Sequence, residues 1–165
     1  MFKSAITVLL TSLFTLAQVN ANTPAYVTTR TLSFETANQL AIAAAEACRK
    51  QGYQVSASVV DRNGNILVLL RDPLAGAHTL EVSRQKAYTA ATFQTATSEM
   101  KNFDALRFAP EVLLVGGGVP IKVGGHFYGA VGISGAPARK ITGDVDEECA
   151  LTGIAAISDA LEFAE

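Results

Sequence analysis

The chain of 165 residues is 49% hydrophobic and 17% charged, with a formal net charge of −2 and an isoelectric point near 5.7. The high hydrophobic fraction and low charged fraction exclude an intrinsically disordered chain. The length is sufficient for one folded domain with a hydrophobic core. Because Lys and Arg form no run, the sequence gives no electrostatic sign of a nucleic-acid partner.

The first 21 residues have the features of a secretory signal peptide. Lys3 provides the positive charge, residues 5–17 are apolar, and Val19-Asn20-Ala21 resembles a cleavage site. The apolar stretch is shorter than the roughly 20 residues that span a bilayer. This length disfavours a stable membrane span, and an amphipathic anchor is the alternative. We therefore expect cleavage near Ala21 and a periplasmic or secreted mature protein.

A polar leader over residues 22–31 precedes what we expect to be a single domain over residues 32–165. Ser33 can cap a helix that begins at Phe34, and Gly52 can end it in the left-handed conformation. Apolar residues recur along this segment at three- and four-residue steps, which predicts a helix packed against a sheet. The predicted stripe consists of Phe34, Ala37, Leu40, Ala41, Ala44 and Ala47 or Cys48.

A hairpin and a second helix follow. The β-rich runs at residues 54–60 and 65–70 flank Asn63-Gly64, a dipeptide that strongly favours a tight hairpin turn. After a break rich in Pro and Gly, helical spacing returns. This spacing predicts a second helix that begins near His78 or Thr79.

Residues 112–137 are rich in glycine and in β-branched and aromatic residues. After a surface connection over residues 101–110, this segment predicts three short strands that end at Ser134 and are joined by tight glycine turns. Because glycine has no Cβ, Gly117 and Gly118 could let a ligand approach the backbone closely.

The last helix is predicted to begin near Asp144, which forms a capping-box pattern with Glu147. The element order is therefore α-β-β-α-β-β-β-α. Hairpin connections this short require antiparallel strands. Together these features predict an α/β sandwich of the α+β type, with a five-stranded antiparallel sheet and helices packed on it.

Cys48 and Cys149 are the only cysteines. In an oxidising compartment they could form a disulfide that closes a loop of about 100 residues, for which chain entropy gives roughly 4 to 5 kcal/mol of stabilisation. Two buried free thiols are the alternative. The spacing excludes a CxxC redox centre and a thiolate zinc site.

Five segments of the chain form a distinctive combined pattern. They are DRNGNILVLLR at residues 61–71, KAYTAATF at 86–93, GGGVPI at 116–121, GAVGISGAP at 129–137 and DEECA at 146–150. Together they resemble the GlcG/HbpS-type haem-binding family and also the PduO C-terminal domain, from about Leu32 to the C-terminus. The resemblance implies a profilin-like or roadblock-like fold, assembly into homo-oligomers including octamers, and haem as a cofactor.

A haem site needs an apolar slot, an iron ligand, and cations or hydroxyls near the propionates. His78 is the preferred iron ligand, since an imidazole at the start of the second helix could coordinate iron with Arg84 within reach of a propionate. Lys86 could contact a propionate or pair with a carboxylate. The candidate cofactor-binding residues are His78, Arg84, Lys86, Tyr88, Gly117 and Gly118.

Other site types lack their sequence patterns. GGGVP has no following GK[ST] and leads into a strand, so it does not predict a phosphate-binding loop. Ser134 lacks the second glycine of a nucleophile elbow. His78 and Glu81 form a lone HxxE, which falls short of a zinc site. His126 is left unassigned, because a hairpin turn would expose it.

We expect an exported protein that sequesters, buffers or senses haem, with slow degradation of the porphyrin as a further activity. A binding protein is favoured over an enzyme. One alternative is an oligomeric assembly or binding module for a small organic ligand or partner protein, without physiological haem. A third interpretation is an enzyme acting on a small hydroxy acid, for which the sequence offers no identifiable nucleophile or cofactor fingerprint.

Overall fold

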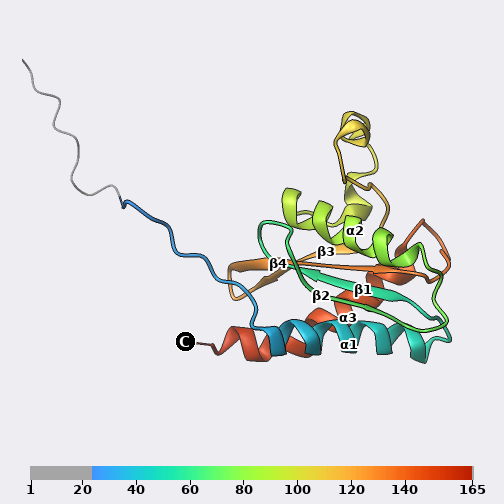
Figure 1. The fold of residues 1–165 in the computed structure, drawn as a ribbon, viewed down its shortest axis with the longest axis horizontal. Coiled ribbons are helices and arrows are strands. Elements are labelled where there is room, and N and C mark those ends of the chain that lie inside the picture. The colour runs from blue at the N-terminus through green and yellow to red at the C-terminus, as the bar shows by residue number, and fades with distance from the viewer. Residues whose placement is uncertain (1–23, 165) are drawn as a thin grey trace, which may run out of the picture.

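The computed structural model describes residues 24–164, and the predicted signal peptide lies outside them. The fold has three layers: α2 covers one face of a four-stranded sheet, and α1 and α3 lie together on the other face (Figure 1). No helix within the described range is long and apolar enough to cross a membrane. The elements are α1 (Phe34–Lys50), β1 (Ser56–Val60), β2 (Ile66–Arg71), α2 (Thr79–Phe93), the short 3-10 helices η1 (Thr97–Met100) and η2 (Asp104–Phe108), β3 (Gly118–Val123), β4 (His126–Ser134) and α3 (Asp144–Glu162).

Helix α1 begins and ends close to where the sequence predicts. The Ser33 hydroxyl accepts a hydrogen bond from the backbone N–H of Thr36 at 3.2 Å, and Gly52 follows the helix with a φ of +87°. The alanine-rich stripe is buried from Ala37 onward, but Phe34 is 67% exposed and does not belong to the core.

The sheet is antiparallel throughout, in the order β2-β1-β4-β3. The β1–β2 hairpin turns at the predicted Asn-Gly dipeptide. Asp61 Oδ1 accepts the backbone N–H groups of Asn63 and Asn65 at 2.8 and 2.9 Å, and Gly64 has a φ of +83°. Every residue of β1 is buried, because helices cover both faces of the sheet there.

The prediction of five strands is wrong, because residues 112–117 form no strand and the order is α-β-β-α-β-β-α. Strand β4 reaches only the last residue of this segment, where the carbonyl of Gly117 accepts from the N–H of Ile133 at 2.9 Å. Threonine side chains bond other backbone groups of the segment. The Thr89 hydroxyl accepts from the N–H of Leu113 at 2.9 Å. The Thr97 hydroxyl donates to the carbonyl of Val115 at 2.7 Å and accepts from the N–H of Gly118 at 2.9 Å.

Glycines in the sheet let α2 approach its backbone closely. A Cβ atom on Gly132 would lie 2.6 Å from the amide nitrogen of Ala87 and closer still to the carbonyl oxygen of Ser83. A Cβ on Gly118 would lie 2.8 Å from the carbonyl carbon of Lys86. The space that the sequence suggested for a ligand at Gly118 is therefore occupied by a helix.

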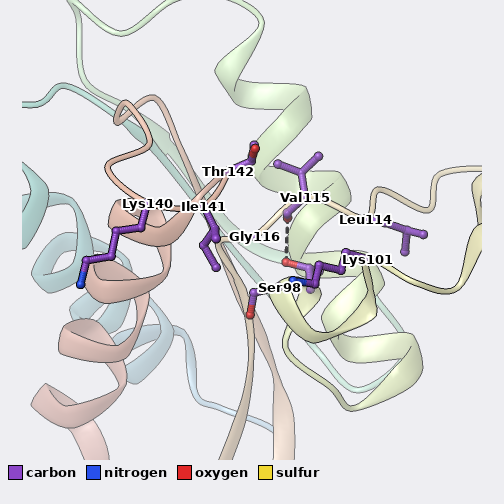
Figure 2. Close-up of a pocket in the computed structure, with 9 residues that line it drawn as sticks. Ser98, Lys101, Leu114, Val115, Gly116, Lys140, Ile141 and Thr142 are labelled. Atoms are coloured by element: carbon purple, nitrogen blue, oxygen red, sulfur yellow. Dashed lines mark hydrogen bonds between the residues drawn. The ribbon is translucent and has the colours of Figure 1, made fainter.

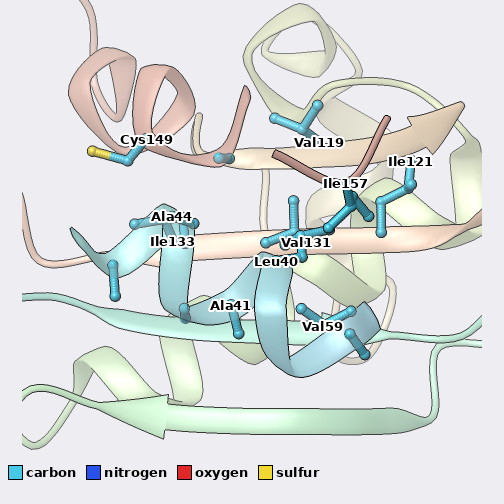
Figure 3. Packing of buried hydrophobic residues seen from close by; sticks show 14 of the residues in the cluster. Leu40, Ala41, Ala44, Val59, Val119, Ile121, Val131, Ile133, Cys149 and Ile157 are labelled. Carbon is cyan, nitrogen blue, oxygen red and sulfur yellow. The ribbon is translucent and has the colours of Figure 1, made fainter. Parts of the chain in front are cut away.

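The main core lies between the sheet and the pair α1 and α3 (Figure 3). Leu40 and Ala44 of α1 meet Ile157 of α3 and the inward side chains of β1, β3 and β4. Cys48 and Cys149 form a disulfide that joins the two helices, with a Cα–Cα distance of 5.5 Å. The structure thus shows the bridged alternative for the two cysteines.

The capping-box prediction for α3 is wrong. Gly143, with a φ of +83°, occupies the N-cap position and has no side chain to cap the helix. The carboxylate of Asp144 accepts from the N–H groups of Arg139 and Lys140 in the preceding loop, at 3.0 and 2.7 Å, and from the N–H of Val145 at 2.9 Å. Glu147 accepts a hydrogen bond from the Ser98 hydroxyl.

Candidate functional site

A buried ion pair lies where four of the sequence motifs meet. Lys86 of α2 and Asp146 of α3 are 2% and 4% exposed, with Nζ and Oδ2 2.8 Å apart. Lys86 Nζ also donates to the carbonyl of Ile133 at 2.9 Å, and Asp146 Oδ1 accepts from the N–H of Ala136 at 3.0 Å. Of the two roles considered for Lys86, the structure shows the carboxylate pair.

Burial has opposite effects on the two partners. It lowers the pKa of Lys86 and raises the pKa of Asp146, and the attraction between the charges counteracts both shifts. Gly117 is part of the same enclosure, since a Cβ there would lie 2.9 Å from Lys86 Nζ and 2.7 Å from Asp146 Cβ. This cluster therefore fixes α2, α3 and the glycine segment together and leaves no room for a ligand between them.

A pocket of about 380 Å³ opens beside this cluster (Figure 2). Its inner wall is the backbone of Gly116, where a Cβ would lie 2.7 Å from the Thr142 carbonyl oxygen. The Ser98 hydroxyl donates to Glu147 Oε1 at 3.0 Å. The lining contains no imidazole, thiol, thioether or phenol, so it offers none of the usual protein ligands of haem iron. The lining residues are Thr97, Ser98, Lys101, Leu114, Val115, Gly116, Lys140, Ile141 and Thr142.

His78 lies away from this pocket, exposed at the N-cap position of α2. Its side chain makes no capping hydrogen bond. The ring lies over Gly76, where a Cβ would come within 2.8 Å of Cε1 and 2.9 Å of Nδ1. The neighbouring Thr79 is buried, and its hydroxyl bonds Ser56 Oγ at 2.7 Å, which fixes the start of α2 on β1. A fixed backbone therefore presents an imidazole to solvent.

The loop before α2 is held by its own hydrogen bonds. Asp72 pairs with Arg49 of α1 at 2.7 Å, and the Arg71 guanidinium donates to the carbonyls of Pro73 and Ala75. Leu74 at its tip is 81% exposed. The loop and the start of α2 thus expose an apolar side chain and an imidazole four residues apart in the chain. Imidazole is a common protein ligand of haem iron.

Arg84 is on the same helix but already has partners. Its guanidinium is 2.7 Å from Glu81 and 2.9 Å from Glu111. Hydrogen bonding, first by Glu81 and then by Glu111, holds the pKa of Arg84 above its usual value. A propionate would have to replace one of these carboxylates.

The structure does not bring the six candidate residues into one site. Lys86, Gly117 and Gly118 are buried in the enclosed cluster. Tyr88 is half-buried over Gly64, ten residues and roughly 15 Å along α2 from His78. Only His78 and Arg84 remain as surface candidates for a shared ligand. The ion-pair partner of Lys86 was missed by sequence reasoning, although it lies in the DEECA segment.

Comparisons with known proteins place the chain in a family. The HbpS-like family, described as "Haem degrading protein HbpS-like", matches residues 32–155. Protein GlcG of Escherichia coli strain K12 is 35% identical over 108 residues, which cover 62% of this chain and 81% of GlcG.

Two solved structures share the fold. A crystal structure of a double mutant of Streptomyces reticuli HbpS has a TM-score of 0.74 and 36% identity, covering 86% of this chain and 97% of that one. The crystal structure of a PduOC:heme complex has a TM-score of 0.67 and 31% identity, covering 77% of this chain and 95% of that one. With the family match extending over most of its length, the chain belongs to the HbpS-like family.

Proposed function

We propose that this protein is an exported haem-binding protein that sequesters, buffers or senses haem. The family match over residues 32–155 carries the proposal, because that family is described as haem-degrading and the similar PduOC structure contains heme. Slow degradation of the bound porphyrin is a further activity that the family description supports.

His78 is the iron ligand in this proposal. Its exposed ring needs no rearrangement of the chain to meet iron, because no capping hydrogen bond engages it. Arg84 lies six residues further along α2, roughly 9 Å, and is the cation for a propionate once a carboxylate gives way. Bound haem would supply iron and its redox chemistry, whereas the chain supplies the imidazole, the apolar Leu74 and the cation.

A second copy of the chain would complete the site. His78 and Leu74 are both exposed, so one copy covers a single side of a flat ligand. A homo-oligomer, the octamer included, would supply the opposite wall.

The proposed export agrees with the disulfide between Cys48 and Cys149. Such bonds persist in oxidising compartments and are rare in the cytosol. The signal-peptide features of residues 1–21 support the same compartment.

A hemin titration of the purified protein tests the role of His78. We expect saturable binding and a defined Soret band for the unaltered protein. In His78→Ala the affinity for hemin should fall or the Soret band should shift, and free imidazole should partly restore both. Gly76→Ala should also alter the band, because the new methyl group displaces the ring. Glu35→Ala is the control, an exposed change in the first turn of α1, at the opposite end of that helix from Arg49. An identical titration and spectrum for His78→Ala would remove His78 from the site.

A further inference from the structure

A second pocket, of about 320 Å³, lies at the end of the sheet where the segment preceding α1 passes the β3–β4 turn (Figure 1). It combines cationic, hydroxyl and imidazole groups with one phenylalanine. No carboxylate is among its lining residues. These are Thr28, Thr29, Arg30, Arg62, His126 and Phe127.

Arg62 is held in a defined position. Its Nη1 donates to the carbonyl of Phe127 at 2.6 Å, and the guanidinium carbon lies 5.0 Å from the centroid of the Phe127 ring. One of five N–H donors is used in this hydrogen bond, so the others remain for a ligand. Phe127 is only 8% exposed, which makes this side of the pocket a firm support.

Neither arginine of the pocket forms an ion pair among the described residues. Within residues 24–164, neither Arg30 nor Arg62 has a carboxylate at ion-pair distance, whereas four other arginines do. Two guanidinium groups that form no ion pair in this range line the same pocket, in a chain of net charge −2. Guanidinium forks bind carboxylate and phosphate groups through paired hydrogen bonds.

We propose that this pocket binds a small organic anion through its phosphate or carboxylate group. Arg30 and Arg62 pair with the oxyanion, and the hydroxyls of Thr28 and Thr29 and the imidazole of His126 add hydrogen bonds. The volume is at the lower end of the range for small-molecule sites, which suits a metabolite-sized anion with a short carbon skeleton.

This site is separate from the one proposed for haem. It shares no residue with His78, Leu74 or Arg84. One of its walls, residues 28–30, precedes the region matched by the HbpS-like family, so the complete pocket is not part of the family match.

Calorimetric titration of the purified protein with inorganic phosphate and, separately, with succinate tests the proposal. Arg30→Gln removes one cation from an exposed side chain and should leave the fold intact. Arg107→Gln is the control, since Arg107 is an exposed arginine of η2 that does not line this pocket. We expect one-site saturation by at least one probe, weakened roughly tenfold or more by Arg30→Gln and less than about twofold by Arg107→Gln.

Each outcome of the two titrations either supports the proposed anion site or overturns it. Saturation by phosphate alone assigns a phosphoryl ligand, saturation by succinate alone assigns a carboxylate, and saturation by both supports the shared oxyanion chemistry. If neither phosphate nor succinate shows saturable binding, the proposal is overturned. Equal weakening by both variants, or no weakening by Arg30→Gln, would also overturn it, because binding would then not depend on this pocket.

Discussion

Replacing Lys86 with methionine should destabilise the protein strongly. Methionine keeps the length of the side chain but leaves the Asp146 carboxylate, 4% exposed, without the ammonium 2.8 Å away. The backbone N–H groups of Ala136 and Gly135 remain as its partners, and neither carries a charge. Removal of one member of a buried pair costs about 3–5 kcal/mol, because the remaining charge stays desolvated. We therefore expect the free energy of unfolding of Lys86→Met to fall by about that amount.

Urea unfolding at pH 7, followed by far-UV circular dichroism, measures this change within a double-mutant cycle. Asp146→Asn retains an acceptor for Ala136 and should cost a similar amount alone. The double variant should lose roughly 1–3 kcal/mol less than the sum of the single changes. Lys122→Met is the control, since exposed Lys122 donates to one carbonyl, that of Gln94, and its loss should cost under about 1 kcal/mol. If the free energy of unfolding of Lys86→Met fell by less than about 1 kcal/mol, the proposed cost of an unpaired buried carboxylate would be refuted. It would also be refuted if the losses of the two single variants added up to the loss of the double variant.

Three further predictions concern the fold. Backbone hydrogen bonds, that from the N–H of Arg139 first among them, lower the pKa of Asp144 from an ordinary 3.8 to about 2. The stabilising contribution of this carboxylate is therefore present above about pH 4 and is lost as the pH falls through 2. Urea unfolding should show a shallower pH dependence for Asp144→Asn between pH 4 and 2, and equal slopes would contradict this. Joint replacement of Cys48 and Cys149 by alanine should lower the free energy of unfolding by about 2–5 kcal/mol, and dithiothreitol should then have no further effect. Gly132→Ala should cost about 1–3 kcal/mol or more, because its methyl group would displace α2, and an unchanged thermal midpoint would show that the helix can move freely.

Local signals in the sequence were sufficient for α1 and for the first hairpin. The Ser33 cap and the Asn-Gly turn each act through residues only two or three positions away. Such interactions depend on the local chain and are therefore readable without the tertiary fold.

The extra strand and the capping box failed for the opposite reason. Residues 112–117 have strand-like composition, but Thr89 and Thr97 from distant segments bond the N–H of Leu113 and the carbonyl of Val115, and β4 pairs only with Gly117. Glu147 has a capping spacing to Asp144, yet Ser98 engages it across 49 residues. Tertiary hydrogen bonds outweighed local preference in both segments.

The position of His78 was predictable, because it is exposed at the start of a helix as the sequence indicates. Its role as an iron ligand stays a prediction. The partnership of Lys86 with Asp146 spans 60 residues, so no spacing rule identifies it. The space that a glycine leaves beside the backbone can be occupied by a ligand or by another part of the chain. At Gly118 it is occupied by α2. Composition does not distinguish a close helix from a close ligand.

The central claim is that the folded protein carries haem. Native mass spectrometry with absorption spectroscopy of the protein isolated from its own compartment tests it most directly. The account predicts a stoichiometric porphyrin bound to an oligomer and a Soret band that changes in His78→Ala. An oligomer without porphyrin, or one loaded with a different metabolite and no haem, would contradict it.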